Sequence, residues 1–400
     1  MKIISKIILL CILSVIPFTH LSAQSVSEDS TIYSSLVTCY PGPEIFELYG
    51  HTAIRIQQGE NDMAFNYGMF SFSEPNFVFR FVKGDANYIL GMYPFMNFLP
   101  SYIERGSKVV EQLLNFSQAQ NQELLRLLLK NAEPQNRSYR YNYIYDNCST
   151  RPRDLIEKIA GKSLTYAQPK DTITFRQEMA IYNANYPWQQ FGIDMALGSG
   201  LDYELNYREQ MFAPIVLMQA FDSATFVADS VRVPLVTKTL VLNDAPDSGA
   251  ILSPTPWYLS PMAFAIVMLA ISIALTLWDI KRGKVSKLFD TLLYMLFGAA
   301  GCIVFFLIFI SIHAATSPNM LAFWLNPFCF LFAILIWIKA VKKVLFWLHF
   351  INFATLLILL AVWYWLPQAA NLAFFPLIGC SVVRSLNYMI INKRCEKGGK

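Results

Sequence analysis

The last third of the chain consists of long hydrophobic runs separated by short polar segments. Five of these runs approach the length of about 20 residues that an α-helix needs to cross a bilayer, the third being the shortest. They cover Trp257–Trp278, Leu288–Ile312, Phe323–Ile338, Val344–Leu366 and Leu372–Ile391. We therefore predict an all-α membrane domain of five transmembrane helices over residues 257–392.

Lysine and arginine are unevenly placed around these runs. The loops Ala314–Ala322 and Pro367–Asn371 contain neither, whereas basic residues follow the first, third and fifth runs, at Lys281, Arg282, Lys284, Lys287, Lys339, Lys342, Lys343, Lys393, Arg394, Lys397 and Lys400. Cytoplasmic loops carry an excess of Lys and Arg. The pattern therefore places the ends of these three runs, and the basic tail 393–400, in the cytoplasm.

Residues 1–23 have the pattern of a secretory signal peptide. Lys2 and Lys6 precede the apolar segment Ile7–Phe18, and Ser22 and Ala23 are the small residues of a cleavage site. An uncleaved membrane anchor is the alternative, and either one exports the residues that follow. Residues 24–247 are thus predicted to form an exported domain, joined to the membrane domain by a linker at 248–256.

The exported segment alternates between strand patterns and helix patterns, which predicts an α+β domain. Strands are predicted at Thr31–Thr38, at Gly50–Ile56 with the hairpin partner MAFNYGMF, and at Lys108–Phe116. Ser117 then caps a helix, and Gln120 completes a capping box. The aromatic stretch between the second and third of these strands matches no single pattern.

A cysteine lies between a predicted strand and a predicted helix. The alternating tyrosines of YNYIY indicate the strand, and Ser149 or Thr150 caps the helix. Cys148 therefore stands at a helix N-terminus, with Arg151 and Arg153 nearby. Both features favour the nucleophilic thiolate over the thiol.

Composition and charge narrow the chemistry. The chain has 400 residues, 54% of them hydrophobic and 15% charged, and a net charge of +4. The basic residues are segregated around the apolar runs, so they indicate membrane topology and not a nucleic-acid surface. No HExxH or CxxC spacing, P-loop, dinucleotide fingerprint or GxSxG elbow is present, so we predict neither a metal nor a cofactor. Gly198-Ser199-Gly200 is interpreted as a structural turn.

His51 and Cys148 remain as one candidate base and one candidate nucleophile. His51 is the only histidine of the predicted exported domain. A histidine that starts a strand and a cysteine that starts a helix are placed as in papain-like enzymes, here in permuted order. The predicted supporting residues are Ser149 or Thr150, whose amides would hold an oxyanion, Asn147 and Arg153 beside the thiol, and Asn66, Asp146 or Tyr49 to orient His51.

GHTAIRI followed by DNCST resembles the permuted NlpC/papain-like superfamily, which includes lecithin:retinol acyltransferase-like enzymes. The chain is more closely similar to the Lnb family of Bacteroidota. That resemblance rests on TCYPGPEIFELYGHTAIRI, FNYGMFSF, YNYIYDNCSTRPRD, LGSGLD and HAATSPN…WLNP, and it covers nearly the whole mature chain.

The resemblance implies a lipoprotein N-acyltransferase of the bacterial inner membrane, with its N-terminal domain in the periplasm. Cys148 and His51 would be its catalytic pair. The acyl donor would be a phospholipid, and the acceptor the amino group of the lipid-bearing N-terminal cysteine of diacylated lipoproteins. No cofactor is implied.

Further residues are candidates for contact with lipid or with the site. Seven aromatic residues either line an acyl groove or belong to the core, namely Phe77, Phe79, Phe81, Tyr88, Tyr93, Phe95 and Phe98. At the outer membrane surface, His313, Asn319 and Asn326 either face the site or satisfy helix ends.

Two other functions remain open at this point. The same Cys–His pair would serve a membrane-tethered cysteine peptidase or amidase of NlpC type, with water as the acceptor. A disulfide between Cys39 and Cys148 would instead make the protein a non-catalytic membrane scaffold.

Overall fold

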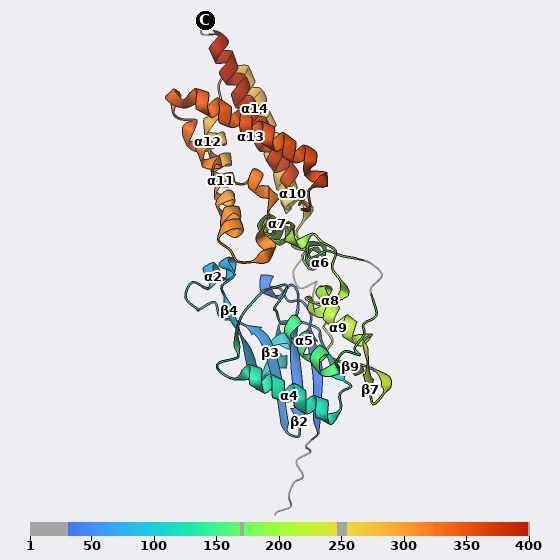
Figure 1. Cartoon of the computed structure of the whole chain (residues 1–400). Helices are drawn as coiled ribbons and strands as arrows, with labels where there is room; N and C mark the ends of the chain where they lie inside the picture. Colours follow the sequence, from blue (N-terminus) through green and yellow to red (C-terminus); the bar gives the residue numbers. More distant parts are fainter. Residues whose placement is uncertain (1–30, 169–171, 246–253, 399–400) are drawn as a thin grey trace, which may run out of the picture.

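The computed structural model describes residues 31–168, 172–245 and 254–398. The predicted signal peptide and most of the predicted linker lie outside these residues. An N-terminal domain of strands and helices is followed by a helical C-terminal domain (Figure 1). This agrees with the predicted order of an α+β domain and an all-α domain.

A sheet of seven strands organises the N-terminal domain, in the order β6-β4-β3-β2-β1-β5-β9, and all neighbouring strands are antiparallel. The strands are β1 (Ile32–Cys39), β2 (His51–Gln58), β3 (Asn61–Met69), β4 (Asn87–Pro94), β5 (Val109–Leu114), β6 (Ser138–Arg140) and β9 (Val236–Asn243). Strands β7 (Thr225–Ala228) and β8 (Val231–Pro234) form a separate hairpin. The predicted β1, β5 and β2–β3 hairpin are confirmed.

Eight α-helices accompany the sheet among the described residues of this domain. They are α2 (Phe77–Lys83), α3 (Phe95–Glu104), α4 (Gln118–Ala132), α5 (Thr150–Ala160), α6 (Phe175–Tyr182), α7 (Pro187–Ala196), α8 (Tyr207–Gln210) and α9 (Pro214–Asp222). The predicted capping box of α4 is confirmed, because the Ser117 and Gln120 side chains each bond the other residue's backbone amide. The unassigned aromatic stretch contains α2 and β4.

The alternation of side chains along β2 distributes them between two cores. Ile54 and Ile56 pack with residues of α4 and α5, such as Leu124 and Ile156. Ala53 packs on the other face, in a cluster with residues of α3. This two-residue period is the one that the sequence predicted for GHTAIRI.

The predicted tyrosine strand is wrong. Residues 141–146 form a turn in which the Asn142 side chain accepts hydrogen bonds from the amides of Ile144 and Tyr145. The strand lies just before it, at β6. An asparagine that caps its own backbone competes with a strand, and this overrode the alternation of the tyrosines.

Four helices of the C-terminal domain are long and apolar enough to cross a membrane: α10 (Pro261–Arg282), α11 (Lys287–Phe309), α13 (Lys342–Val362) and α14 (Phe374–Gly398). The predicted helix at Phe323–Ile338 is not confirmed, because it contains only α12 (Cys329–Leu335). Pro327 lies just before α12. Because proline has no backbone N–H, it cannot donate the hydrogen bond that would continue a helix from the preceding turn.

The segment around α12 nevertheless runs along α11 in the opposite direction. Near its start, the Asn326 backbone packs directly on Gly301, where a Cβ would lie within 2.5 Å of the Asn326 Cα. Near its end, Trp337 donates a hydrogen bond of 2.9 Å to Thr291, close to the start of α11. The segment therefore covers much of the length of α11 without forming a long helix.

The two domains are joined by backbone hydrogen bonds. The amide of Gly198 donates to Ala315, and the amide of Ser199 donates to Pro318, each at 2.8 Å. The Gly198 turn is thus structural, as predicted, and it packs against the loop HAATSPN. Figure 1 shows α6 and α7 between the sheet and the membrane helices.

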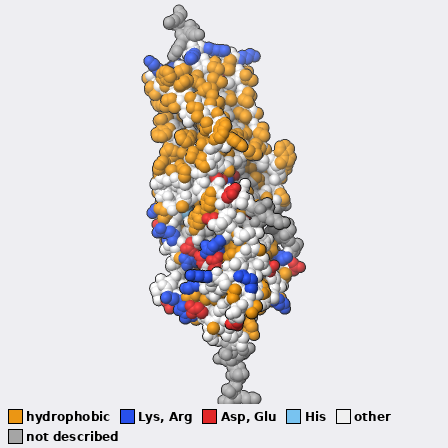
Figure 2. All heavy atoms as spheres, turned by 45° about the vertical axis from the view of Figure 1, so that its right-hand side comes forward, with side chains coloured by type: hydrophobic (Ala, Val, Ile, Leu, Met, Phe, Trp, Pro, Cys, Tyr) orange, Lys and Arg blue, Asp and Glu red, His pale blue; other side chains and the backbone are white. Residues whose placement is uncertain are grey.

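The surface reflects the same division. Figure 2 shows hydrophobic side chains over the visible face of the membrane domain, with Lys and Arg side chains at its end far from the sheet domain. Both signs of charge are mixed over the N-terminal domain.

Candidate active site at the start of strand β2

Cys148 is held in place by the residue before it. The Asn147 carboxamide oxygen accepts hydrogen bonds from the amides of Ser149 and Thr150, at 2.8 and 2.9 Å. Its Nδ2 donates to the carbonyl oxygens of Tyr143 and Phe212. Asn147 therefore binds two amides at the start of α5, where the N-cap residue Ser149 makes no capping bond with its side chain, and it ties the Cys148 loop to two other segments.

His51 and Cys148 come together around Gly68 of β3. A Cβ placed on Gly68 would lie 3.5 Å from the Cys148 Cβ and 4.0 Å from the His51 Cε1. Gly68 has φ of +92°, a conformation that other residues rarely adopt, and the β3–β4 register shifts here. A glycine thus leaves the space between the two side chains open.

Asn66 is the predicted orienting candidate that contacts His51. Its Oδ1 lies at hydrogen-bond distance from the His51 Nε2, and its Nδ2 donates to the Tyr93 hydroxyl at 2.7 Å. A carboxamide oxygen can only accept, so the Nε2 that faces the Asn66 Oδ1 is the donor. This leaves the Nδ1 with a free lone pair, as a base requires.

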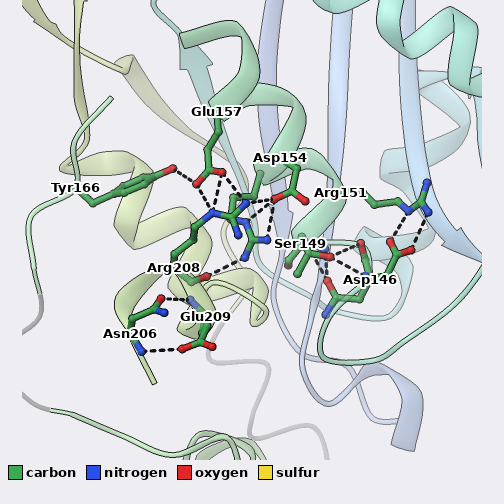
Figure 3. Close-up of polar contacts among 12 residues, drawn as sticks. Asp146, Ser149, Arg151, Asp154, Glu157, Tyr166, Asn206, Arg208 and Glu209 are labelled. Atoms are coloured by element: carbon green, nitrogen blue, oxygen red, sulfur yellow. Dashed lines mark hydrogen bonds and ion pairs between the residues drawn. The ribbon is translucent and has the colours of Figure 1, made fainter. Parts of the chain in front are cut away.

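The other two orienting candidates bond residues other than His51. The Asp146 carboxylate forms a paired contact with Arg151, at 2.5 and 2.8 Å (Figure 3). The Tyr49 hydroxyl accepts a hydrogen bond from Asn183. In each case the fold supplies a polar partner from another segment, and Asn66 is the candidate for which a hydrogen bond to His51 is observed.

The sulfur of Cys148 lies in a polar but buried niche. The Cys148 side chain belongs to the buried core, with 8% exposure. Burial raises the pKa of the Cys148 thiol to about 11, although the amides of Thr52 and Cys148 and the Ser149 hydroxyl oppose the shift. Thr52 follows His51 in β2, and its hydroxyl lies 3.2 Å from that of Ser149.

The predicted role of the arginines is wrong. Arg151 is bound to Asp146 and stacks on Tyr139, and Arg153 is bound to Asp154 and to the Arg208 carbonyl. Figure 3 shows the Arg151 guanidinium paired with the Asp146 carboxylate. Their charge is already paired, so burial decides the thiol pKa.

The predicted oxyanion donors are also wrong. The amides of Ser149 and Thr150 are already bound by Asn147. The amides of Thr52 and Cys148, which act on the sulfur itself, are the remaining candidates.

The imidazole is uncharged at neutral pH. Burial lowers the pKa of His51 to about 4, and the hydrogen bond that the imidazole makes to the Asn66 oxygen opposes this only in part. The resting pair is therefore a neutral thiol beside a neutral base, in which the base can accept the thiol proton when the sulfur attacks.

Sequence reasoning missed Tyr102, which contacts His51, and Arg105, which contacts Tyr102. The Tyr102 ring lies parallel to the His51 ring, with centroids 6.1 Å apart. Arg105 lies over Tyr102 and forms a salt bridge of 2.6 Å with Glu47. Nothing in the local sequence of α3 indicated either contact, because both depend on how α3 packs across the sheet.

Cys39 and Cys148 are both free and buried in the structure. Cys39 pairs with His51 in the β1–β2 register, so it lies beside the site. Burial strongly raises the pKa of the Cys39 thiol, which makes it a poor nucleophile.

The three membrane-side candidates make contacts between segments. His313 bonds the Phe81 carbonyl, at 2.8 Å, and Asn319 donates to the Met195 carbonyl. Asn326 donates to the Ala322 carbonyl one turn earlier. Their side chains thus satisfy backbone groups, which is the second of the two predicted roles.

Four of the seven aromatic candidates belong to the core: Phe77, Tyr88, Phe95 and Phe98. Phe79 is 55% exposed and contacts Phe306 of α11, with ring centroids 5.7 Å apart. Among the described residues, no group of three His, Cys, Asp or Glu side chains comes together as a metal site.

Comparison with known proteins identifies both parts of the chain. Residues 22–178 match the model of the Lnb N-terminal periplasmic domain, and residues 253–395 match that of the Lnb transmembrane domain. No curated protein and no solved structure gave a significant match. The two matches follow one another in the expected order, a periplasmic domain and then a transmembrane domain, so the chain belongs to the Lnb family of membrane proteins with a periplasmic domain.

Proposed function

We propose that this protein is a membrane-bound N-acyltransferase. It moves a fatty acyl chain from a phospholipid, through a thioester on Cys148, to the amino group of the lipid-modified N-terminal cysteine of lipoproteins. The observation that carries the proposal is the meeting of Cys148 and His51 around Gly68, with Asn66 bonded to the imidazole. This arrangement provides a nucleophile, a base and an orienting group.

The reaction has two steps. The Cys148 sulfur attacks the ester carbonyl of the phospholipid while the thiol proton passes to His51, and the lysophospholipid leaves with that proton. The free amine then attacks the thioester, gives its proton to His51, and releases the reprotonated thiol. The amides of Thr52 and Cys148 would stabilise the oxyanion in both steps.

Burial of the thiol favours transfer over hydrolysis. A thioester must survive until the amine arrives, so water has to be kept from the carbonyl. Cys148 is in the buried core, and its domain is fastened to membrane helices. Donor and acceptor are both held in the same bilayer, which raises their effective concentration at the thiol.

We further propose that the chain crosses the inner membrane five times, the third time through the interrupted segment around α12. Trp337 bonds Thr291 near the start of α11, and the Lys393 ammonium lies over the Phe346 ring. The starts of α11 and α13 and the end of α14 would then share the cytoplasmic side, where the basic residues lie. We also propose that the exported domain has a permuted papain-like fold, in which His51 starts a strand and Cys148 precedes a helix.

The test is to trap the intermediate. The full-length protein in phospholipid nanodiscs, without acceptor, is expected to carry one fatty-acyl group on the peptide that contains Cys148. Neutral hydroxylamine should remove it. Cys148→Ala and His51→Ala should abolish it while the protein remains folded and inserted.

The acceptor is tested in the same system. A diacylated lipopeptide with a free N-terminal amine should discharge the thioester and yield the N-acyl product, whereas an N-acetylated lipopeptide should leave the enzyme loaded. A cysteine peptidase would form no lipid adduct and would cleave peptide substrates. Failure to trap the acyl group, with lipoprotein N-termini unchanged when the protein is absent, would refute the proposal.

A further inference from the structure

The N-terminal domain carries an apolar patch beside the membrane helices. The patch consists of Ile45, Phe46, Phe72, Val78 and Phe79, each between 54% and 66% exposed. Phe72 connects its parts, because its ring lies 5.9 Å from that of Phe46 and 5.4 Å from that of the buried Phe77. Clustered exposed aromatic residues are uncommon on a water-facing surface.

Contacts between α2 and the end of α11 place this patch beside the membrane domain. The amide of Ile312 donates to the Lys83 carbonyl at the end of α2, and Ser311 donates to the Val82 carbonyl. Figure 1 shows α2 next to the end of α11 that is nearer the sheet. Phe79, on α2, meets Phe306 of α11. The patch therefore continues the apolar surface of a transmembrane helix.

Aromatic rings lead from the patch to the thiol. The Phe70 ring contacts that of Phe46 at 5.7 Å and that of Tyr88 at 5.0 Å. Tyr88 stacks on Tyr141 at 4.0 Å, and the Tyr141 ring lies 3.7 Å from the point where a Gly68 Cβ would stand. The same point is 3.5 Å from the Cys148 Cβ.

The two cations of α2 are paired with neighbouring carboxylates. Arg80 forms a salt bridge with Glu74, and Lys83 forms one with Asp85. No cation among these four is left to recognise a headgroup or an acidic protein. The chemistry that fits the patch is therefore hydrocarbon.

We propose that the patch is embedded in the periplasmic leaflet, and that the acyl chain of a bilayer phospholipid enters there and follows the aromatic rings to Cys148. This proposal rests on the proposed function, because the end point of the lipid route is the Cys148 thiol. The occupant of the patch is a lipid chain because the patch is uncharged and continuous with the membrane surface of α11.

The first test detects the lipid itself. Photoreactive benzoylphenylalanine is introduced in place of Phe46 or Phe72 in the full-length protein, in nanodiscs of phosphatidylethanolamine and phosphatidylglycerol. Illumination is expected to attach phospholipid at both positions. The matched control is the same residue in place of Tyr33, which is 52% exposed at the end of β1 away from His51. The lipid adducts should persist in a Cys148→Ala background, because binding precedes chemistry.

The second test measures the rate of thioester formation. Phe46→Ser and Phe72→Ser should each slow it by about tenfold, the effect of losing one large apolar contact with the lipid chain. Tyr33→Ser should stay within about twofold of the wild-type rate. The thermal midpoints of all three variants are compared, since these side chains are exposed and should contribute little to folding.

The outcomes separate the two proposals. Three results would overturn the entry route without touching the proposed thioester chemistry. They are lipid adducts that are no more frequent at positions 46 and 72 than at position 33, adducts to a second copy of the chain, and equal rates in all three serine variants. Lipid adducts at 46 and 72 with no thioester on the wild-type thiol would support the lipid surface and refute the proposed function.

Discussion

The protonation state of the resting pair can be measured through the reactivity of Cys148. Burial raises the pKa of the thiol to about 11, while it lowers that of His51 to about 4. The thiol should therefore be protonated throughout the range between these values. An ion pair of thiolate and imidazolium would instead be reactive from mildly acidic pH upward.

The magnitude follows from the fraction of thiolate. At pH 7 a free cysteine with a pKa of about 8.5 is about 3% ionised, whereas a thiol with a pKa of about 11 is about 0.01% ionised. Alkylation of native Cys148 by iodoacetamide at pH 7 should thus be about 300-fold slower than in the unfolded chain, before any effect of restricted access. The rate should rise about tenfold per pH unit from pH 7 to 10.

The assay follows the mass of the peptide that contains Cys148, from protein in nanodiscs and from the same protein in denaturant. The slope against pH is the diagnostic quantity, because restricted access lowers the rate equally at each pH. His51→Ala is the control, and it should leave the slope unchanged because the imidazole is neutral in this range. A native rate that is independent of pH between 5 and 8 would refute the neutral pair.

Three further predictions concern the supporting structure. Asn66→Ala should slow thioester formation by about a hundredfold, since a base that is no longer oriented loses its alignment with the thiol; an unchanged single-turnover rate would remove Asn66 from the mechanism. Gly198→Ala should lower the stability of the protein by about 1–3 kcal/mol, because the new Cβ overlaps the loop after α11, whereas Gly192→Ala in α7, where a Cβ meets nothing within 4 Å, should not. Thermal unfolding compares the two, and equal midpoints would contradict the tight junction between the domains. A reporter fused after Lys400 should be cytoplasmic and one fused after residue 245 periplasmic; the same side for both would mean that the segment around α12 does not cross.

Local patterns in the sequence were sufficient for the elements that depend on nearby residues. The capping box of Ser117 and Gln120 and the hairpin of β2 and β3 were predicted because each is decided within a few residues along the chain. The four long membrane helices follow from apolar runs in the same way. The candidate pair itself followed from composition, because the predicted exported domain has one histidine.

Tertiary packing decided what the pattern of residue types left open. Three polar residues were equal candidates to orient His51, and only the pairing of β3 with β4 places Asn66 between the imidazole and Tyr93. The helix-start amides were expected to hold an oxyanion, but the Asn147 side chain folds back onto them.

The environment of the thiol also came from the fold alone. The sequence placed cations next to Cys148, and these predict a lowered pKa. In the structure Arg151 and Arg153 are paired with neighbouring carboxylates, and the Cys148 side chain is buried where α5 packs against β2. The sequence by itself determined which side chains are available and on which elements they lie. The pairing of a charge and the exposure of a thiol to water both depend on segments that are distant in the sequence and pack around the group. Only the tertiary structure therefore decided the chemistry at Cys148.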